Sequence, residues 1–232
     1  MPKAKRKSEF VCSFCDKEFV TERSLLKHTC RTKLRFMDKD TPYCRLAYRA
    51  YYRFYEISIS ARKKKTFDDF IRSRYYSEFI KFGKYIIDNN ILEPTNFIDF
   101  VIKSSIPIDK WLHSSLYEIY LRDLVKRESA DDAAERTISL MCQWANEYGH
   151  EYFDFFRLIE PTLFVHYIKL GRISPWVLYN CDSGKELLEK RLNPDQISII
   201  VEWIDPSFWA AKFKVNKEER ESLFKFFKEQ GL

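Results

Sequence analysis

The sequence predicts a mostly α-helical protein with a small metal-held module near its N-terminus. Of the 232 residues, 45% are hydrophobic and 17% are aromatic, which is enough for a sizeable core. Only 5 residues are glycine, and no segment sustains the period-2 alternation of a half-buried strand. Apolar residues instead recur at helical spacing. We therefore expect a small N-terminal metal module followed by an all-α helical domain.

The module is defined by three cysteines and one histidine. Cys12 and Cys15 form a Cys-x2-Cys knuckle, twelve residues separate Cys15 from His28, and Cys30 follows after one more residue. Zn²⁺ binds four such sulfur and nitrogen ligands tetrahedrally. A segment this short buries too little apolar surface to fold without its metal. The spacing therefore predicts Cys12, Cys15, His28 and Cys30 as zinc ligands.

The apolar residues around these ligands follow a known pattern. Phe10 lies two residues before the first cysteine, Phe19 four after the second, and Leu25 three before the histidine. With these positions the segment resembles the Cys2His2 zinc-finger family, in a C2HC variant. The resemblance covers about 20 residues and implies a ββα finger within residues 10–36. Its hairpin would cross the two knuckle cysteines and its helix would run from about Thr21 to His28.

The last ligand departs from the family pattern. The family places this ligand three to five residues after the histidine, whereas Cys30 is two positions beyond His28. Side chains two residues apart on a continuous helix point about 200° away from each other. Both can bind one metal only if the helix ends or unwinds at His28. Cys44 or Asp38 as the fourth ligand, or reduced cysteines in a small core, are the alternatives.

Charge is segregated along the chain. Residues 1–84 contain 22 Lys and Arg and 10 Asp and Glu, a net charge of 22 − 10 = +12. The totals of 40 and 34 leave 18 and 24 for residues 85–232, a net charge of 18 − 24 = −6. A basic third on an acidic remainder is typical of a chain that meets a polyanion at one end. We expect nucleic acid there, DNA rather than RNA, and a protein partner at the acidic helical body.

This charge pattern divides the chain into four segments. They are a basic arm (1–9), the finger (10–36), a basic helical bridge (37–90) and an acidic helical domain (91–232). The predicted nucleic-acid contacts are Lys and Arg side chains of the finger and the bridge. They are Arg23, Lys27, Arg31, Lys33, Arg35, Arg45, Arg49, Arg53, Arg62, Lys63, Lys64 and Lys65. If the finger docks as its family does, Thr21, Arg23, Ser24 and Lys27 would face the major groove.

The bridge begins with a helix over about residues 43–57. One helical face carries Arg45, Arg49 and Arg53. A neighbouring stripe carries Tyr48, Tyr52 and Tyr55. Phosphates can follow the arginines, and unpaired bases can stack on the tyrosines. Aromatic residues at helical spacing are also typical of a packed core.

A second helix is predicted to start after Thr66. This threonine is a favourable N-cap, and Asp68 and Asp69 lie in the first turn, where the helix dipole favours carboxylates. Apolar periodicity extends from Phe67 to about Asn89 and predicts one continuous helix. A metal-dependent nuclease pair is the alternative role for the two aspartates, but capping accounts for both.

The acidic body repeats an acid-proline-hydroxyl signature at three predicted helix starts. It occurs in Leu92–Phe97, Ile159–Phe164 and Ile204–Trp209. Ser129 to Tyr148 is a further predicted helix. Its predicted buried stripe consists of Ala134, Ile138, Met141, Cys142 and Ala145.

The sequence lacks the motifs of several classes of enzyme and nucleotide-binding protein. The sequence contains no phosphate-binding or dinucleotide-binding glycine loop, no H-E-x-x-H and no G-x-S-x-G. We predict no catalytic residues and no enzyme, with a nuclease as the remaining alternative. No apolar run approaches about 18 residues, and no secretory signal precedes residue 10. We expect no membrane association and an intracellular protein, in the host cytoplasm if phage-encoded or the nucleus if eukaryotic.

Taken whole, a finger joined to a Tyr- and Arg-rich helical body resembles small zinc-finger proteins of T-even-like tailed phages. This resemblance implies a role in viral DNA replication, late transcription or packaging. The sequence-based hypothesis is a zinc-finger nucleic-acid-binding accessory protein. A protein–protein adaptor that uses the finger and the helical body is the competing hypothesis.

Overall fold

The computed structural model describes residues 10–57 and 64–232. The chain forms two compact units, one within residues 1–116 and the other within residues 117–232. Most described residues are helical, as predicted, and the described strands form one two-stranded antiparallel sheet near the N-terminus. The divisions predicted at residues 36 and 90 both fall inside the first unit.

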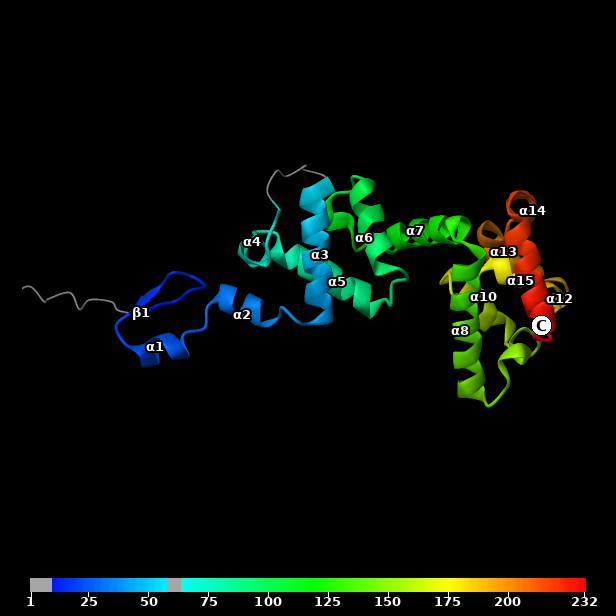
Figure 1. Cartoon of the computed structure of the whole chain (residues 1–232), viewed down its shortest axis with the longest axis horizontal. Coiled ribbons are helices and arrows are strands. Elements are labelled where there is room, and N and C mark those ends of the chain that lie inside the picture. Colours follow the sequence, from blue (N-terminus) through cyan, green and yellow to red (C-terminus); the bar gives the residue numbers. More distant parts are fainter. Residues whose placement is uncertain (1–9, 58–63) are drawn as a thin grey trace, which may run out of the picture. The chain divides into compact units, whose positions relative to one another are not determined.

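The first unit starts with the sheet and continues as short helices (Figure 1). Its elements are β1 (Phe10–Val11), β2 (Glu18–Phe19), α1 (Glu22–Lys27), α2 (Arg31–Met37), α3 (Pro42–Ile57), α4 (Phe67–Arg72), α5 (Tyr76–Asp88), α6 (Pro94–Lys103) and the 3-10 turn η1 (Ile108–Lys110). Helix α7 (Ser114–Arg127) begins in this unit and ends in the second.

The second unit is all helical in its described residues. Its elements are α8 (Ala130–Tyr148), the 3-10 turn η2 (Tyr152–Asp154), α9 (Phe155–Leu158), α10 (Pro161–Lys169), α11 (Pro175–Leu178), α12 (Asp182–Glu186), the π-helical turn η3 (Leu187–Arg191), α13 (Pro194–Ile204), α14 (Pro206–Val215) and α15 (Lys217–Glu229). None of the described helices has the length and apolar character of a bilayer-crossing segment.

Close packing of α3 against α5 forms the centre of the first unit. Gly83 of α5 makes this approach possible, since a Cβ at this position would lie 2.2 Å from the Tyr43 carbonyl oxygen and 3.1 Å from the Ala47 Cβ. Trp111 closes the core, with ring centroids 5.8 Å from Phe79 and 5.0 Å from Phe82. The face of α3 turned to this core is therefore fixed by backbone contact and aromatic packing.

The helix predicted from Phe67 to Asn89 is interrupted, and this prediction was wrong. Helix α4 ends at Arg72, Ser73 is extended with φ −63° and ψ 141°, and α5 begins at Tyr76. A residue distant in sequence stabilises the break, because Arg35 donates to the carbonyl oxygens of Ile71 at 2.6 Å and of Ser73 at 3.4 Å. The guanidinium therefore supplies a donor to the Ile71 carbonyl at the break and adds to the Tyr76 N–H that donates to the Ser73 carbonyl at 3.3 Å.

The predicted caps of α4 are confirmed. The Thr66 hydroxyl accepts from the backbone N–H of Asp69 at 3.2 Å, and the Asp69 carboxylate accepts from the backbone N–H of Thr66 at 2.8 Å. Asp68 accepts from Arg72 one turn later, at 2.9 Å. Both aspartates thus have structural partners within their own helix.

Helix α8 spans the predicted segment, with Ser129 as its N-cap, but its buried face differs from the predicted one. Its buried residues are Ala130, Ala133, Thr137, Leu140, Met141, Trp144 and Ala145. Cys142 is exposed. The polar Thr137 can be buried because its hydroxyl accepts from the Ser174 backbone N–H at 3.0 Å. A tertiary hydrogen bond thus lets Thr137 lie on the core side of α8, although the apolar periodicity did not include it in the buried stripe.

The three predicted helix starts are confirmed as α6, α10 and α14, each with proline in its first turn. Glu160 caps α10 by accepting from the Leu163 backbone N–H, and Asp205 caps α14 by accepting from the Ser207 backbone N–H. Glu93 instead adopts a left-handed conformation and makes no side-chain cap. The signature therefore locates the starts, although the acid acts as a cap in two of them.

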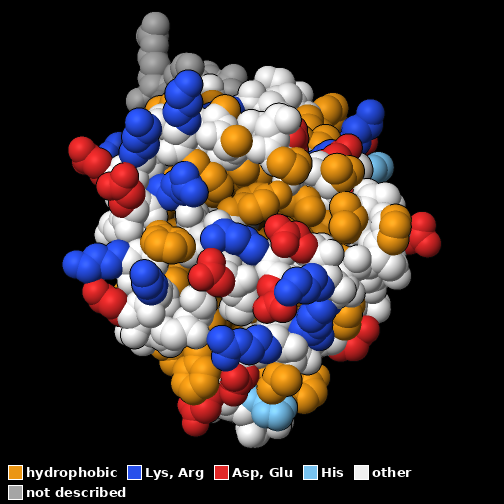
Figure 2. Space-filling model, turned by 90° about the vertical axis from the view of Figure 1, so that its right-hand side faces the viewer, with side chains coloured by type: hydrophobic (Ala, Val, Ile, Leu, Met, Phe, Trp, Pro, Cys, Tyr) orange, Lys and Arg blue, Asp and Glu red, His pale blue; other side chains and the backbone are white. Residues whose placement is uncertain are grey.

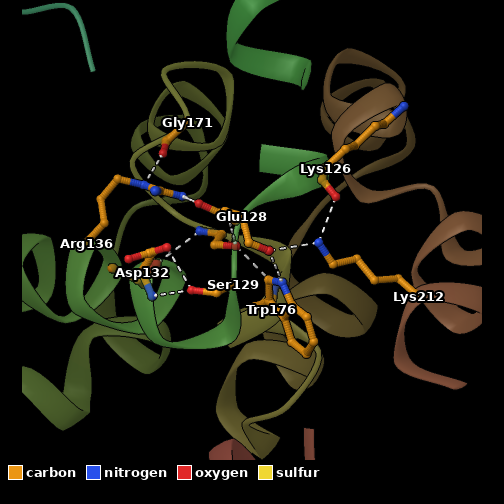
Figure 3. Close-up of polar contacts among 10 residues, drawn as sticks. Lys126, Glu128, Ser129, Asp132, Arg136, Gly171, Trp176 and Lys212 are labelled. Carbon is orange, nitrogen blue, oxygen red and sulfur yellow. Dashed lines mark hydrogen bonds and ion pairs between the residues drawn. The ribbon is translucent and has the colours of Figure 1, made fainter. Parts of the chain in front are cut away.

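A buried polar network closes the junction between α7 and α8 (Figure 3). Glu128, whose side chain is 2% exposed, pairs with Arg136 at 2.5 Å and accepts from the Ser174 hydroxyl at 2.6 Å. Burial raises the pKa of Glu128, and the opposing effect of Arg136 is smaller. Lys212 donates to the carbonyl oxygens of Lys126 at 2.7 Å and of Glu128 at 2.9 Å. The Lys212 ammonium therefore caps the C-terminal carbonyl groups of α7.

We expect Gly83→Ala to destabilise the first unit. In an isolated helix, replacing glycine by alanine is stabilising by about 1 kcal/mol. At position 83, however, the Cβ of alanine would overlap the Tyr43 carbonyl. The expected net loss is about 1–3 kcal/mol, measured as reduced protection from amide hydrogen exchange in α3 and α5. Gly149→Ala is the control, since its Cβ would meet nothing within 4 Å and only its φ of +72° opposes alanine. Unchanged protection in Gly83→Ala would contradict the close approach.

We expect Arg53→Gln to cost about 1.5–3 kcal/mol of unfolding free energy, the range for hydrogen bonds to charged groups. Arg53 donates to both Asp99 carboxylate oxygens, at 2.8 Å and 2.6 Å. This hydrogen bonding lowers the pKa of Asp99, so the stabilisation is present above the unfolded pKa of about 3.9 and is lost as pH falls through the folded value.

The measurement is urea denaturation followed by circular dichroism, at neutral pH and in acid. The difference between wild type and Arg53→Gln should shrink in acid, because Asp99 is then protonated in both proteins. Arg49→Gln, an exposed arginine one turn earlier on α3, is the matched control and should change stability little. Equal effects of the two variants would show that the Asp99 pair is not stabilising.

Candidate metal centre and nucleic-acid interface

A tight hairpin positions the first two cysteines. The sheet pairs Phe10 with Phe19 and Val11 with Glu18. Beyond it the Cys12 backbone N–H donates to the Lys17 carbonyl at 2.9 Å, and the Asp16 N–H donates to the Cys12 carbonyl at 2.9 Å. Asp16 adopts a left-handed φ of 56°, a conformation that aspartate tolerates better than most residues. The turn therefore brings the Cys12 and Cys15 thiols to the same end of the hairpin.

Helix α1 ends where the ligand spacing requires it to end. Thr21 caps its start, and its last helical residue is Lys27. His28 is extended, with φ −71° and ψ 125°, and Cys30 is extended, with φ −104° and ψ 162°. The Cys30 sulfur accepts from the Lys33 backbone N–H at 3.4 Å as the N-cap of α2. The change of direction between the two helices thus lets His28 and Cys30 face the same point.

The four predicted ligands form one cluster. One ligand atom from each of Cys12, Cys15, His28 and Cys30 lies within 4.8 Å of all the others. The Cys15 sulfur is 3.2 Å from the His28 Nε2. The alternatives for the fourth ligand are not in this cluster. Asp38 is the C-cap of α2, and Cys44 is fully buried in α3, where burial raises its thiol pKa to about 11.

This donor set fits a tetrahedral metal. Metal–sulfur distances of about 2.3 Å require tetrahedral ligand separations of about 3.8 Å, so ligand atoms within 4.8 Å need only small movements to close. Burial opposes ionisation of Cys12, but hydrogen bonds from the Phe14 and Cys15 backbone and from the Cys15 and Cys30 side chains together lower its pKa. These four side chains can therefore hold a metal ion.

Aromatic contacts connect the cluster to the helices of the first unit. Phe14, inside the knuckle, lies 5.2 Å from Phe36 of α2, and Phe36 lies 6.2 Å from Phe67 of α4. Arg35 of α2 lies over the Tyr76 ring at 4.2 Å and bonds to the end of α4. Since Cys30 caps α2, the ligand loop and the helical core share this short helix.

The predicted nucleic-acid contacts differ in exposure. Arg62 and Lys63 lie outside the described residues, as does the basic arm 1–9. The exposed members are Arg23, Lys27, Arg31, Arg45, Arg49 and Lys64. The half-buried members are Lys33, Arg35, Arg53 and Lys65. Binding of nucleic acid by any of them stays a prediction.

The half-buried cations have partners within the protein. Arg35 bonds to α4 and Arg53 to Asp99, as described above, and the Lys33 ammonium donates to the His28 carbonyl at 3.4 Å. Asp99 and Tyr76 are the partners that sequence reasoning did not identify. Arg53 and Asp99 are 46 residues apart, so no local pattern indicates that they meet.

The tyrosine stripe of α3 is mostly part of the core packing. Tyr48 lies 5.3 Å from Phe67 and donates to the Lys65 carbonyl at 3.2 Å. Tyr55 packs on Tyr51 at 4.8 Å. Tyr52 is half-buried. Stacking of bases on this stripe would therefore have to compete with intramolecular contacts at Tyr48 and Tyr55.

No protein-family model, curated protein or solved structure matches the chain. The geometry defines a mostly helical protein whose N-terminal Cys3His cluster can hold a metal ion.

We expect the protein to bind one divalent ion per chain at this cluster. Titration with Co²⁺ should give the absorption of a tetrahedral sulfur-rich site, and Cys30→Ser should weaken binding or shift the spectrum, because it removes one of three thiolates. Cys44→Ser is the matched control and should leave the spectrum unchanged. The reverse result, loss of the spectrum with Cys44→Ser alone, would place the fourth ligand in α3.

Proposed function

We propose that the protein is a zinc-finger nucleic-acid-binding accessory protein. The observation that carries the proposal is the Cys3His cluster, held between a β-hairpin and a short helix. Its donors match the preference of Zn²⁺ for thiolate and imidazole in a closed four-ligand site. The order β1, β2, α1 supports a ββα finger. The metal would hold the module folded and has no open position for catalysis.

The exposed side chains of α1 support docking on nucleic acid. Arg23 and Lys27 are exposed one turn apart, while the Thr21 and Ser24 hydroxyls bond to each other at 2.8 Å. The two cations are therefore the members of the predicted reading set most available to a base edge or phosphate, and arginine and lysine pair best with guanine. A helix fits the DNA major groove but not the deep, narrow groove of double-stranded RNA, which favours DNA.

The partner context follows from the resemblance and from the charge of the chain. The net charge of +12 over residues 1–84 favours a polyanion, and −6 over residues 85–232 does not. We propose that the helical body binds a protein partner in viral DNA replication, late transcription or packaging. On the side of the structure that carries α12 and α15, basic and acidic side chains are interspersed around gathered hydrophobic ones (Figure 2). Such a mixed surface suits a protein more than a nucleic acid.

A protein–protein adaptor is the second candidate, and exposed apolar side chains of the N-terminal elements favour it. Leu26 of α1 is 71% exposed and Met37 of α2 is 70% exposed. Val11, Val20 and Leu34 are also about half exposed. Large apolar side chains exposed on so small a module can contact a partner protein.

The test of the proposed function is fluorescence anisotropy of labelled duplex and single-stranded oligonucleotides with zinc-loaded protein. We expect duplex binding that weakens steeply with salt, because each neutralised phosphate contributes about −0.9 to the log–log slope. Removal of zinc with a chelator should weaken binding, since the finger unfolds. Absence of binding to either strand form at low salt would reject the nucleic-acid function in favour of the adaptor.

A further inference from the structure

Helix α3 presents two arginines on the side opposite the core. Its buried residues Cys44, Ala47, Ala50 and Tyr51 face the interior of the first unit. Arg45 and Arg49 are exposed, and both lie about half a helical turn away from the middle of that buried face. The packing of α3 on α5 therefore holds both guanidinium groups towards solvent.

These two arginines have little compensation within the protein. Arg45 is 3.9 Å from Asp40, with side chains 70% and 88% exposed, an arrangement that contributes little binding energy in water. Within residues 10–57 and 64–232 the Arg49 guanidinium makes no hydrogen bond or ion pair, although its charge makes a small contribution to the lowered pKa of Asp99. Arg53, the third arginine of the sequence pattern, pairs with Asp99 and Glu56 and is therefore not available to a ligand on this face. The two arginines of α3 that remain available thus lie in its N-terminal half.

A second segment adds cations along the edge of the same face. The Lys65 carbonyl accepts from the Tyr48 hydroxyl at 3.2 Å, and the Lys65 ammonium lies 4.8 Å from the Tyr55 ring. Tyr48 lies beside Arg45 on the helix surface, and Tyr55 lies about two turns further along α3. Lys64, next in the chain, is exposed. Cations from two separate segments therefore lie along one side of α3, which sequence spacing alone does not require.

The spacing of the two arginines fits a phosphate backbone. One helical turn separates Arg45 from Arg49, about 6 Å along the helix axis. Two steps along one strand of a duplex advance about 7 Å. Arginine forms bidentate bonds with phosphate oxygens, and an exposed helix face lacking a pocket suits contact with phosphates better than readout of bases.

We propose that Arg45 and Arg49, with Lys64 and Lys65, form a second nucleic-acid surface that binds the phosphate backbone independently of the metal. This inference rests on the proposed nucleic-acid function. It extends that function because α3 is positioned by α5, α6 and Trp111, and not by the Cys3His cluster. The finger and the α3 surface would thus contribute separately to affinity, the second through charge alone.

The experiment compares Arg45→Gln/Arg49→Gln with the control Lys214→Gln/Lys228→Gln, which removes the same charge from exposed positions of α14 and α15. Duplex binding is measured by anisotropy for zinc-loaded and chelator-treated full-length protein. The arginine variant should have a log–log salt slope about 1.8 shallower than wild type, for two lost phosphate contacts. Its affinity deficit should be about tenfold larger at about 50 mM than at about 200 mM salt, and the slope change should be the same with and without zinc.

Lys64→Gln/Lys65→Gln should lower the salt slope in the same way, and the control variant should match wild type. Circular dichroism should show an unchanged fold for Arg45→Gln/Arg49→Gln, because both side chains are exposed. A wild-type slope in this variant would overturn the inference, as would a deficit that disappears when zinc is removed. If chelation weakens wild-type binding while the arginine variant behaves as wild type, the α3 surface is rejected and the finger function stands. Absence of wild-type binding with zinc would reject both.

Discussion

The fold depends on cationic side chains that cover the carbonyl ends of short helices. A short helix leaves its last carbonyl groups without intrahelical donors, and a chain of many short helices multiplies this cost. Four cationic side chains supply donors to such carbonyl groups, at the ends of α4, α7 and α9 and after α10. They are Arg35 on Ile71 and Ser73, Lys212 on Lys126 and Glu128, Arg191 on Phe156, Arg157 and Ile159, and Arg136 on Gly171. Each of these bonds joins residues more than 30 positions apart, so helix capping and tertiary structure form together.

This use of cations limits how far net charge can be interpreted as a binding surface. Arg35 and Arg53 belong to the basic third of the sequence, yet their guanidinium groups are occupied by carbonyl oxygens and by Asp99. Fewer of the predicted nucleic-acid contacts are therefore exposed than composition indicates. The exposed ones lie on α1, at the start of α2, on the outer face of α3 and just before α4. Some Lys and Arg side chains therefore stabilise the fold, and only the others are available to contact a polyanion.

The Cys3His cluster depends on a similar use of helix ends. The cluster forms because α1 stops at Lys27 and α2 starts at Arg31, with His28 and Cys30 both extended between them. Cys30 is at once a cluster member and the N-cap of α2, and α2 is fixed to α4 by Arg35 and Phe36. Metal binding and the docking of α2 are thus coupled through Cys30 and through the contact of Phe14 with Phe36. The outer face of α3, positioned by α5 and α6, is not part of this coupling.

The sequence by itself determined what depends on neighbours along the chain. The capping of α4 by Thr66, the start of α8 at Ser129 and the three proline starts are set by residues within a few positions of one another. The four ligands lie within one stretch of 19 residues. Only the tertiary structure decided the break at Ser73, the exposure of Cys142, the burial of Thr137 and the pairing of Arg53 with Asp99. In three of these four the partner is more than 30 residues away, and Cys142 faces outwards because the core packing of α8 sets which side of that helix is buried. Periodicity reports which residues share a helix face, but it does not report which partner that face meets.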